Sequence, residues 1–101
     1  MKPRSMTKII DRKRYNTETA TLIAGDDYWD GSNYERKGRN RFLYRTSKGA
    51  YFLVTQTQWQ GEQDTLLPLW KGDAITLWET DLTEHLCSFE DAFPGVEVED
   101  A

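Results

Sequence analysis

The chain of 101 residues has a formal net charge of −4 and an uneven charge distribution: residues 1–49 hold 12 basic and 6 acidic side chains, whereas residues 50–101 hold 1 basic and 11 acidic side chains. A single cysteine excludes an internal disulfide and a cysteine-based zinc site, and no apolar run approaches the roughly 18 residues of a membrane span. One domain over residues 1–101, with 13% aromatic residues, predicts a modest core rich in rings and a surface with a basic and an acidic side.

The first third of the chain predicts short strands joined by tight turns. These are a strand at 8–10, a turn at 11–12, a returning strand at 13–16, a turn at 17–19 and a strand at 20–24. Asn16 can accept a hydrogen bond from the backbone of the second turn, which is typical of Asn before a turn. We expect residues 1–6 and residues 96–101 to be flexible ends.

Residues 25–40 predict a long polar loop, and long loops in small domains are more often functional than neutral. Tyr and Trp beside charged residues are typical of binding hot spots. The candidate binding residues of this loop are Asp26, Asp27, Tyr28, Trp29, Asp30 and Tyr34. An alternative is that Trp29 folds back onto the core. The acids lack the order of a calcium-binding loop, so we expect no metal.

A basic run follows at 36–41 and predicts an alternative function, contact with nucleic-acid phosphates. The residues concerned are Arg36, Lys37, Arg39 and Arg41. The same run is also compatible with solvated charges that flank a hydrophobic strand. The acidic second half of the chain and a pI near 4.9 argue against free-standing DNA binding.

The strongest structural signal is a β-hairpin in which residues 41–46 and 50–55 flank Ser47-Lys48-Gly49. Gly is expected at the last position of such a loop, which requires positive φ. This register pairs Tyr44 with Phe52 and Phe42 with Val54. Because side chains alternate across a sheet, these four residues share one face, which we predict to be the core face.

The C-terminal half predicts an edge strand and helices. Pro68 removes a ladder donor from a strand at 65–69 and so confines it to an edge. Helical spacing predicts a helix over 71–80, and a capping pattern at 81–84 followed by an apolar stripe predicts a second helix over 82–93. The resulting fold class is α+β: an antiparallel sheet of about four to six strands, with one or two C-terminal helices packed on the Phe42 face.

The sequence predicts no enzyme and no cofactor. His85 and Cys87 are two residues apart on the predicted helix, so their side chains would point about 200° apart around its axis and could not form a dyad. A second His or Cys that could complete a transition-metal site is missing from the chain.

Two stretches resemble a known family. Residues 14–20, Arg-Tyr-Asn-Thr-Glu-Thr-Ala, and residues 43–53, Leu-Tyr-Arg-Thr-Ser-Lys-Gly-Ala-Tyr-Phe-Leu, are similar to motifs of small bacterial and prophage-encoded proteins, some of which act as anti-CRISPR inhibitors. The chain departs from that pattern at 56–60 and at 70–73. The shared motifs fall in a turn and a hairpin, so they support the fold more than the function.

The resemblance implies a cytoplasmic, non-catalytic inhibitor that binds a host protein or protein–RNA complex, such as a Cas nuclease or a Cascade-type effector, and contacts no membrane. Cas proteins hold nucleic acid in positively charged channels, which an acidic surface could occupy. Besides the residues of the loop, the candidate contacts are Trp59, Glu62, Asp64, Asp73 and Glu79. The alternative is a structural or regulatory protein of a mobile element that contacts nucleic acid through residues 36–41.

Overall fold

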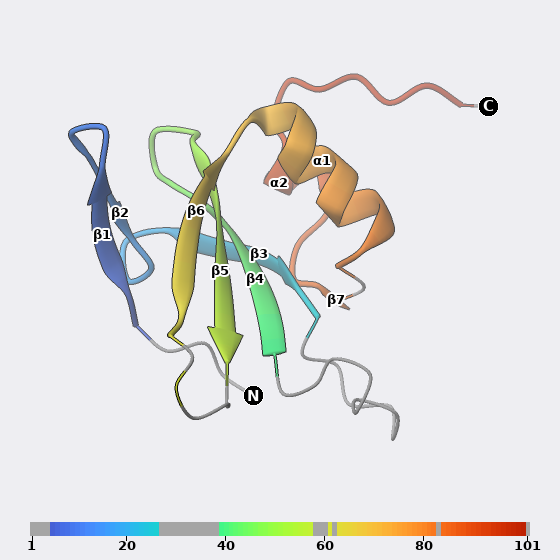
Figure 1. The fold of residues 1–101 in the computed structure, drawn as a ribbon. Helices are drawn as coiled ribbons and strands as arrows, with labels where there is room; N and C mark the ends of the chain where they lie inside the picture. The colour runs from blue at the N-terminus through green and yellow to red at the C-terminus, as the bar shows by residue number, and fades with distance from the viewer. Residues whose placement is uncertain (1–4, 27–38, 58–60, 62, 83, 101) are drawn as a thin grey trace.

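The computed structural model describes residues 5–26, 39–57, 61, 63–82 and 84–100, which form an α+β fold (Figure 1). The elements in chain order are β1 (Thr7–Ile10), β2 (Lys13–Asn16), β3 (Thr21–Gly25), β4 (Arg39–Arg45), β5 (Tyr51–Thr57), β6 (Thr65–Leu69), α1 (Lys71–Thr80), β7 (Glu84–His85) and α2 (Phe89–Ala92).

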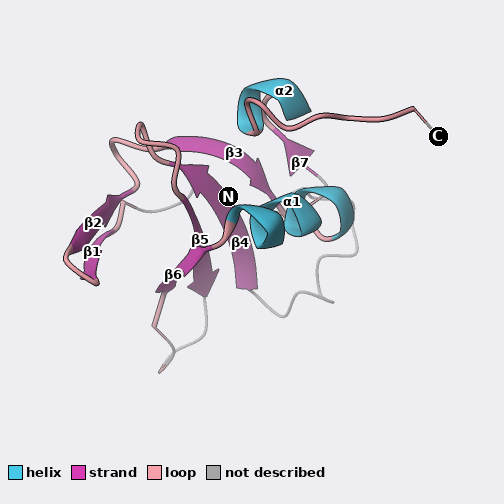
Figure 2. Cartoon of the chain, turned by 90° about the horizontal axis from the view of Figure 1, so that it is seen from above, coloured by secondary structure: helices cyan, strands magenta, loops and turns pink. Residues whose placement is uncertain are grey.

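The strands form two antiparallel sheets. The larger has five strands in the order β6-β5-β4-β3-β7, and the smaller is the β1-β2 hairpin. Seen from above, the hairpin lies on one side of the five-stranded sheet and the two helices lie on the other (Figure 2). The predicted fold class is therefore confirmed, and it has three layers: hairpin, sheet and helices.

The β1-β2 hairpin closes through a two-residue turn at Asp11 and Arg12, whose φ angles are 51° and 65°. The predicted second turn is also present, because the Glu18 N–H donates to Asn16 Oδ1 at 2.9 Å. Met6, in the segment predicted to be flexible, donates its N–H to Thr17 Oγ1 at 2.8 Å. Residues 1–4 of that segment lie outside the described residues.

The β4-β5 hairpin has the predicted register. Tyr44 pairs with Phe52 and Phe42 with Val54, the Thr46 N–H donates to the Ala50 carbonyl oxygen at 2.8 Å, and Gly49 has a φ of 85°. β6 is an edge strand, as predicted, and pairs Pro68 with Phe52. Proline has no N–H to donate to a neighbouring strand. At Pro68 the nitrogen faces the outer side of this edge strand, where the described residues place no further strand that could accept a hydrogen bond.

The prediction of the face covered by the helices is wrong. Phe42, Tyr44, Phe52 and Val54 pack under the β1-β2 hairpin with Tyr15. The helices cover the opposite face, in a cluster made of Ile23, Ala24, Leu43, Tyr51, Ala74, Trp78, Leu82, Ala92 and Phe93. Both faces of the β4-β5 hairpin are apolar. The alternation of side chains along its strands therefore could not predict which face the helices cover.

A bulge in β3 adds to the core on the helix side. Leu22 pairs with Tyr44 and Ala24 pairs with Leu43, so Ile23 is an extra residue between them. Ile23 and Ala24 both belong to the helix-side cluster, although they are consecutive. A regular strand would place them on opposite faces, and the bulge removes that alternation.

The C-terminal segment differs from the predicted helix over 82–93. α1 spans Lys71–Thr80 as predicted, but residues 84–85 form β7, which pairs with the end of β3, and Leu86 N–H donates to the Ile23 carbonyl oxygen at 3.0 Å. The short α2 begins after Ser88, whose Oγ accepts from Asp91 N–H at 3.2 Å. Backbone groups of residues 84–86 thus form hydrogen bonds with β3, instead of the internal hydrogen bonds of the predicted helix. Within the described ranges, no helix is long and apolar enough to cross a membrane.

Candidate functional site

The fold separates the charges into two regions on opposite sides of the sheet. Residues 7–16, the hairpin layer, hold four basic side chains and Asp11. Residues 71–100, which we call the helix layer although they include the edge strand β7, hold nine acidic side chains and Lys71. The two layers lie on either side of the sheet (Figures 1 and 2). The asymmetry along the sequence therefore becomes an asymmetry across the molecule, which can orient a charged partner.

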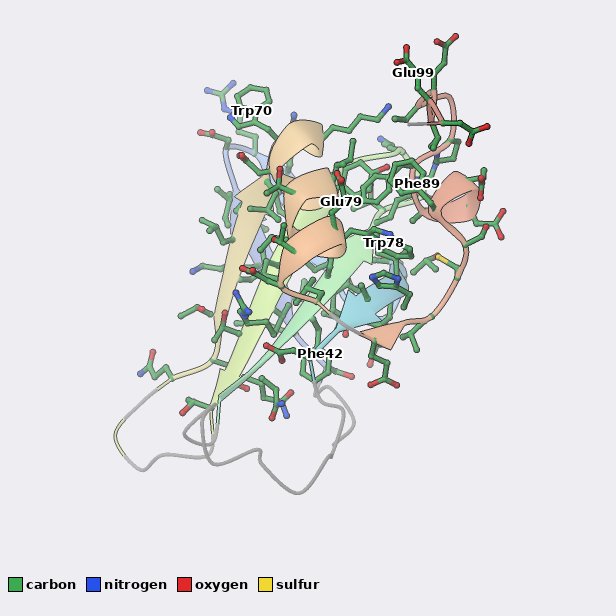
Figure 3. All side chains as sticks on the ribbon, turned by 90° about the vertical axis from the view of Figure 1, so that its right-hand side faces the viewer. Phe42, Trp70, Trp78, Glu79, Phe89 and Glu99 are labelled. Carbon is green, nitrogen blue, oxygen red and sulfur yellow. The ribbon has the colours of Figure 1, made fainter. Side chains whose placement is uncertain are left out.

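The acidic region contains a groove of about 580 Å³, which we call the acidic groove. It lies between α1, β7, α2 and the C-terminal segment. Its lining residues are Ile75, Trp78, Glu79, His85, Phe89, Glu90, Val96, Glu97 and Val98. Figure 3 shows Trp78, Glu79 and Phe89 on this side of the molecule.

Aromatic rings form the floor of the acidic groove. The His85 ring stacks on Trp78 with 3.8 Å between ring centroids and 10° between planes, and His85 Nε2 lies 2.9 Å from the Trp78 carbonyl oxygen. Phe89 meets Trp78 edge-on, with centroids 6.3 Å apart. The stack joins β7 to α1, because Trp78 is on the helix and His85 is on the strand. Packing among three elements, α1, β7 and α2, therefore holds the floor.

Carboxylates form the rim of the acidic groove. Glu79 comes from the last turn of α1, Glu90 from α2 and Glu97 from the C-terminal segment, and all three are exposed. They take part in no ion pair with another residue of the described ranges. Aromatic faces attract cations through their quadrupoles, and carboxylates pair with guanidinium and ammonium groups. The groove is therefore suited to lysine and arginine side chains.

Two of the candidate binding residues have structural roles. Asp26 is only 5% exposed, and its carboxylate accepts hydrogen bonds from Arg41 N–H at 2.6 Å and Arg41 Nε–H at 3.1 Å. Asp64 Oδ1 accepts from Thr57 N–H at 3.0 Å and so closes the connection between β5 and β6. Asp64 is therefore more than an exposed turn residue, because a backbone donor relies on its carboxylate.

The other two described acids are exposed on α1, Asp73 in its first turn and Glu79 in its last. Glu79 belongs to the acidic groove, whereas Asp73 does not line it. The remaining candidates of the acidic surface and the polar loop lie outside the described residues. They are Asp27, Tyr28, Trp29, Asp30, Tyr34, Trp59 and Glu62.

The predicted basic contact at 36–41 is described only in part. Arg36 and Lys37 lie outside the described residues, and Arg39 is described only as the first residue of β4. Arg41 pairs with Asp26 and also places Nη1 3.5 Å from Asp81 Oδ2. Its guanidinium links β3, β4 and the end of α1, which is a structural role.

The groove could not be predicted from the sequence, because its residues come from separate segments. The helix predicted over 71–80 contains Trp78, and the helix predicted over 82–93 contains both His85 and Phe89, whereas in the structure His85 lies on β7 and Phe89 begins the short α2. Glu90 and Glu97 had no feature that distinguished them from other solvated acids. The one available signal was the density of acidic residues after residue 70.

The lone thiol has a raised pKa. Burial of the half-buried Cys87 side chain raises the pKa of its thiol, the Asp91 carboxylate raises it further, and Arg45 acts in the opposite direction. A raised pKa lowers the thiolate fraction at neutral pH, and the thiolate is the nucleophile. In the part of the chain that the structure describes, no group of three or more His, Cys, Asp or Glu side chains is placed to hold a metal ion.

Comparison with known proteins adds no family assignment. No protein-family model matches the chain, and no curated protein or solved structure matches it significantly.

Proposed function

We propose that this is a non-catalytic binding protein whose acidic groove receives a basic segment of a partner protein. The observation that carries the proposal is the combination of an aromatic floor with a carboxylate rim. Trp78, with His85 stacked on it, and Phe89 supply the floor, and Glu79, Glu90 and Glu97 supply the rim. Since Trp78 is itself only 6% exposed, an arginine side chain would lie against the exposed His85 ring and the half-buried Phe89 ring while its guanidinium meets a carboxylate.

The expected energetics favour this kind of ligand. A cation over an aromatic face contributes about 0.5–1 kcal/mol at exposed sites and more when desolvated. An exposed charge pair at the rim adds only about 0–1 kcal/mol, and its main effect is on the association rate. The nine acids of the helix layer also raise the association rate of a basic partner through long-range attraction.

The partner class we propose is a protein that holds nucleic acid in a positively charged channel. The acidic groove would occupy part of that channel and exclude the nucleic acid. The resemblance to prophage proteins makes Cas nucleases and Cascade-type effectors the first partners to test. In this chain, residues 14–20 of the shared motif form the end of β2 and the turn after it, so the motif supports the fold.

The test compares two double charge reversals that change the net charge equally. Glu79→Lys/Glu90→Lys alters the rim, and Glu99→Lys/Asp100→Lys alters exposed acids that do not line the groove. Calorimetry with an arginine-rich peptide should show a loss of at least about tenfold for the rim variant, which corresponds to about 1.4 kcal/mol, and little loss for the control. Equal losses would show that only net charge matters and would overturn the groove as the site.

The inhibitor role needs its own measurement. Purified Cas effectors are assayed for DNA binding with and without the protein, at several salt concentrations. The proposal is supported if the control variant still inhibits DNA binding by the effector and the rim variant does not. If no effector type is inhibited but peptide binding still depends on the rim, the Cas partner is wrong. The acidic groove then remains the site for a basic segment of another protein.

A further inference from the structure

A second hollow lies on the opposite, basic side of the molecule. It measures about 490 Å³ and runs between the β1-β2 hairpin and the β4-β5 turn. Its lining residues are Arg12, Lys13, Arg14, Tyr15, Asn16, Thr19, Thr46, Ser47, Lys48 and Ala50. Figure 1 shows the tip of the hairpin beside the turn that joins β4 to β5.

The charge in this hollow is entirely positive. Arg12, Lys13, Arg14 and Lys48 are all exposed, and the residues around them carry hydroxyl and amide groups. None of the four forms an ion pair with another residue of the described ranges. Four such cations, Arg12 in the β1-β2 turn, Lys13 and Arg14 on β2 and Lys48 in the β4-β5 turn, would suit an anion with several charges. The acidic pI of the whole chain does not oppose this, because the acids of residues 71–100 lie across the sheet.

The backbone at the hairpin tip is strained. Arg12 has a φ of 65°, in the left-handed region that costs an ordinary residue free energy and that glycine adopts without cost. A two-residue hairpin turn of this kind favours Asp-Gly, and the chain has Asp11 followed by Arg12. A strained residue at a site where glycine would be more stable points to a function for its side chain. Here that side chain lines the hollow.

The hollow continues toward an exposed indole ring. An adjoining hollow of about 310 Å³ shares Lys13, Tyr15 and Ala50 with the first and extends to Trp70. Trp70 is 82% exposed, and its side chain makes no capping hydrogen bond to α1. Figure 3 shows Trp70 projecting from the end of β6, far from Phe42. Among the described residues, Asp11 is the one acid that lines either hollow.

We infer that these two hollows together form a binding site for single-stranded nucleic acid. The four cations would contact successive phosphates, and Trp70 would stack on an unpaired base. Single-strand sites combine a positive groove with aromatic stacking in this way. A duplex keeps its bases stacked inside, so it could use the cations but not the exposed indole. The inference does not rest on the function proposed for the acidic groove.

The first experiment measures fluorescence anisotropy of a labelled oligothymidine of about a dozen nucleotides, within the range of single-strand site sizes. Each phosphate contact should contribute roughly −0.7 to the slope of log affinity against log salt. Lys48→Glu should weaken binding and make the slope shallower by about that amount. Lys8→Glu is the matched control, because Lys8 is exposed on β1 and does not line either hollow. Equal losses for the two variants would overturn the site.

Two further measurements separate nucleic-acid recognition from general attraction to anions. Trp70→Ala should weaken oligothymidine binding by roughly five- to hundredfold, the usual effect of removing a stacking ring, and should leave binding to heparin unchanged. If Trp70→Ala has no effect on either ligand, the site binds polyanions in general and the inference is wrong. A duplex of the same length that binds as tightly as the single strand would likewise overturn the inference.

Arg12→Gly is the sharpest variant, because stability and binding should move in opposite directions. Relief of the left-handed strain should raise the melting temperature, while loss of the guanidinium should weaken oligothymidine binding by severalfold. A variant that is more stable and binds equally well would show that Arg12 has no part in the site.

Discussion

The Tyr51 hydroxyl donates a hydrogen bond of 2.8 Å to the Ala92 carbonyl oxygen, across a separation of 41 residues. Both residues are buried, and the Tyr51 ring stacks on Phe93 with centroids 5.1 Å apart. This contact joins strand β5 to the short helix α2. Since α2 has only four residues, its position depends on such tertiary contacts and not on its own helical stability. The position of Phe89 and Glu90 in the acidic groove depends on it in turn.

Tyr51→Phe should destabilise the protein by about 1–3 kcal/mol, because it leaves a buried carbonyl oxygen without its donor. The ring and its packing on Phe93 remain, so the loss isolates the hydrogen bond. Chemical denaturation measures the change, with an unchanged denaturant slope as the check that the folded state is intact. A cost near zero would mean that another donor reaches Ala92.

Phe52→Ala should be severely destabilising, by roughly 3–5 kcal/mol. Phe52 is fully buried, stacks on Tyr44 with centroids 5.0 Å apart and meets Tyr15 edge-on at 5.6 Å. Leu53→Ala should cost less, because Leu53 is only partly buried on the other face. The two variants are compared by chemical denaturation, and the opposite order would contradict the importance of the hairpin-side core.

Asp26→Asn should destabilise the protein by about 1.5–3 kcal/mol, the range for a lost hydrogen bond to a charged group. The asparagine oxygen could still accept from Arg41 N–H, but its amide group would then face Arg41 Nε–H, donor against donor. Thermal unfolding measures the loss. Arg41→Met in the Asp26→Asn background should restore part of it, since the second donor is then absent. If Arg41→Met restores no stability, the loss comes from the hydrogen bond between Arg41 N–H and the residue 26 side chain alone.

Cys87 should react slowly with iodoacetamide near neutral pH, because burial raises the pKa of its thiol. The rate should rise with pH and should increase when the protein is unfolded in denaturant. With the folded pKa above the unfolded one, the contribution of Cys87 to stability is constant below the ordinary thiol pKa and falls as pH rises from that pKa through the folded pKa. Mass spectrometry measures labelling, and Cys87→Ser removes the only cysteine as the control. A thiol that reacts as fast folded as unfolded would contradict the raised pKa.

Local patterns in the sequence correctly predicted the elements that depend on local conformation. The Ser47-Lys48-Gly49 turn set the β4-β5 register because Gly49 adopts a φ of 85° at no steric cost. Helical spacing predicted α1, and Pro68 placed β6 at the sheet edge. In each case the signal lies within about ten residues of the structure that it specifies, so no knowledge of distant partners is required.

Tertiary structure decided what depends on distant partners. Residues 84–85 pair with the free edge of β3 instead of continuing a helix, and that pairing brings His85 onto Trp78. Both faces of the β4-β5 hairpin are apolar, so nothing in the local sequence determined which face the helices cover and which the β1-β2 hairpin covers. Asp26, an apparent loop acid, is buried because Arg41 satisfies it. Backbone preferences act between near neighbours, whereas burial and pairing depend on which surfaces meet, and both candidate binding sites are made where such surfaces meet.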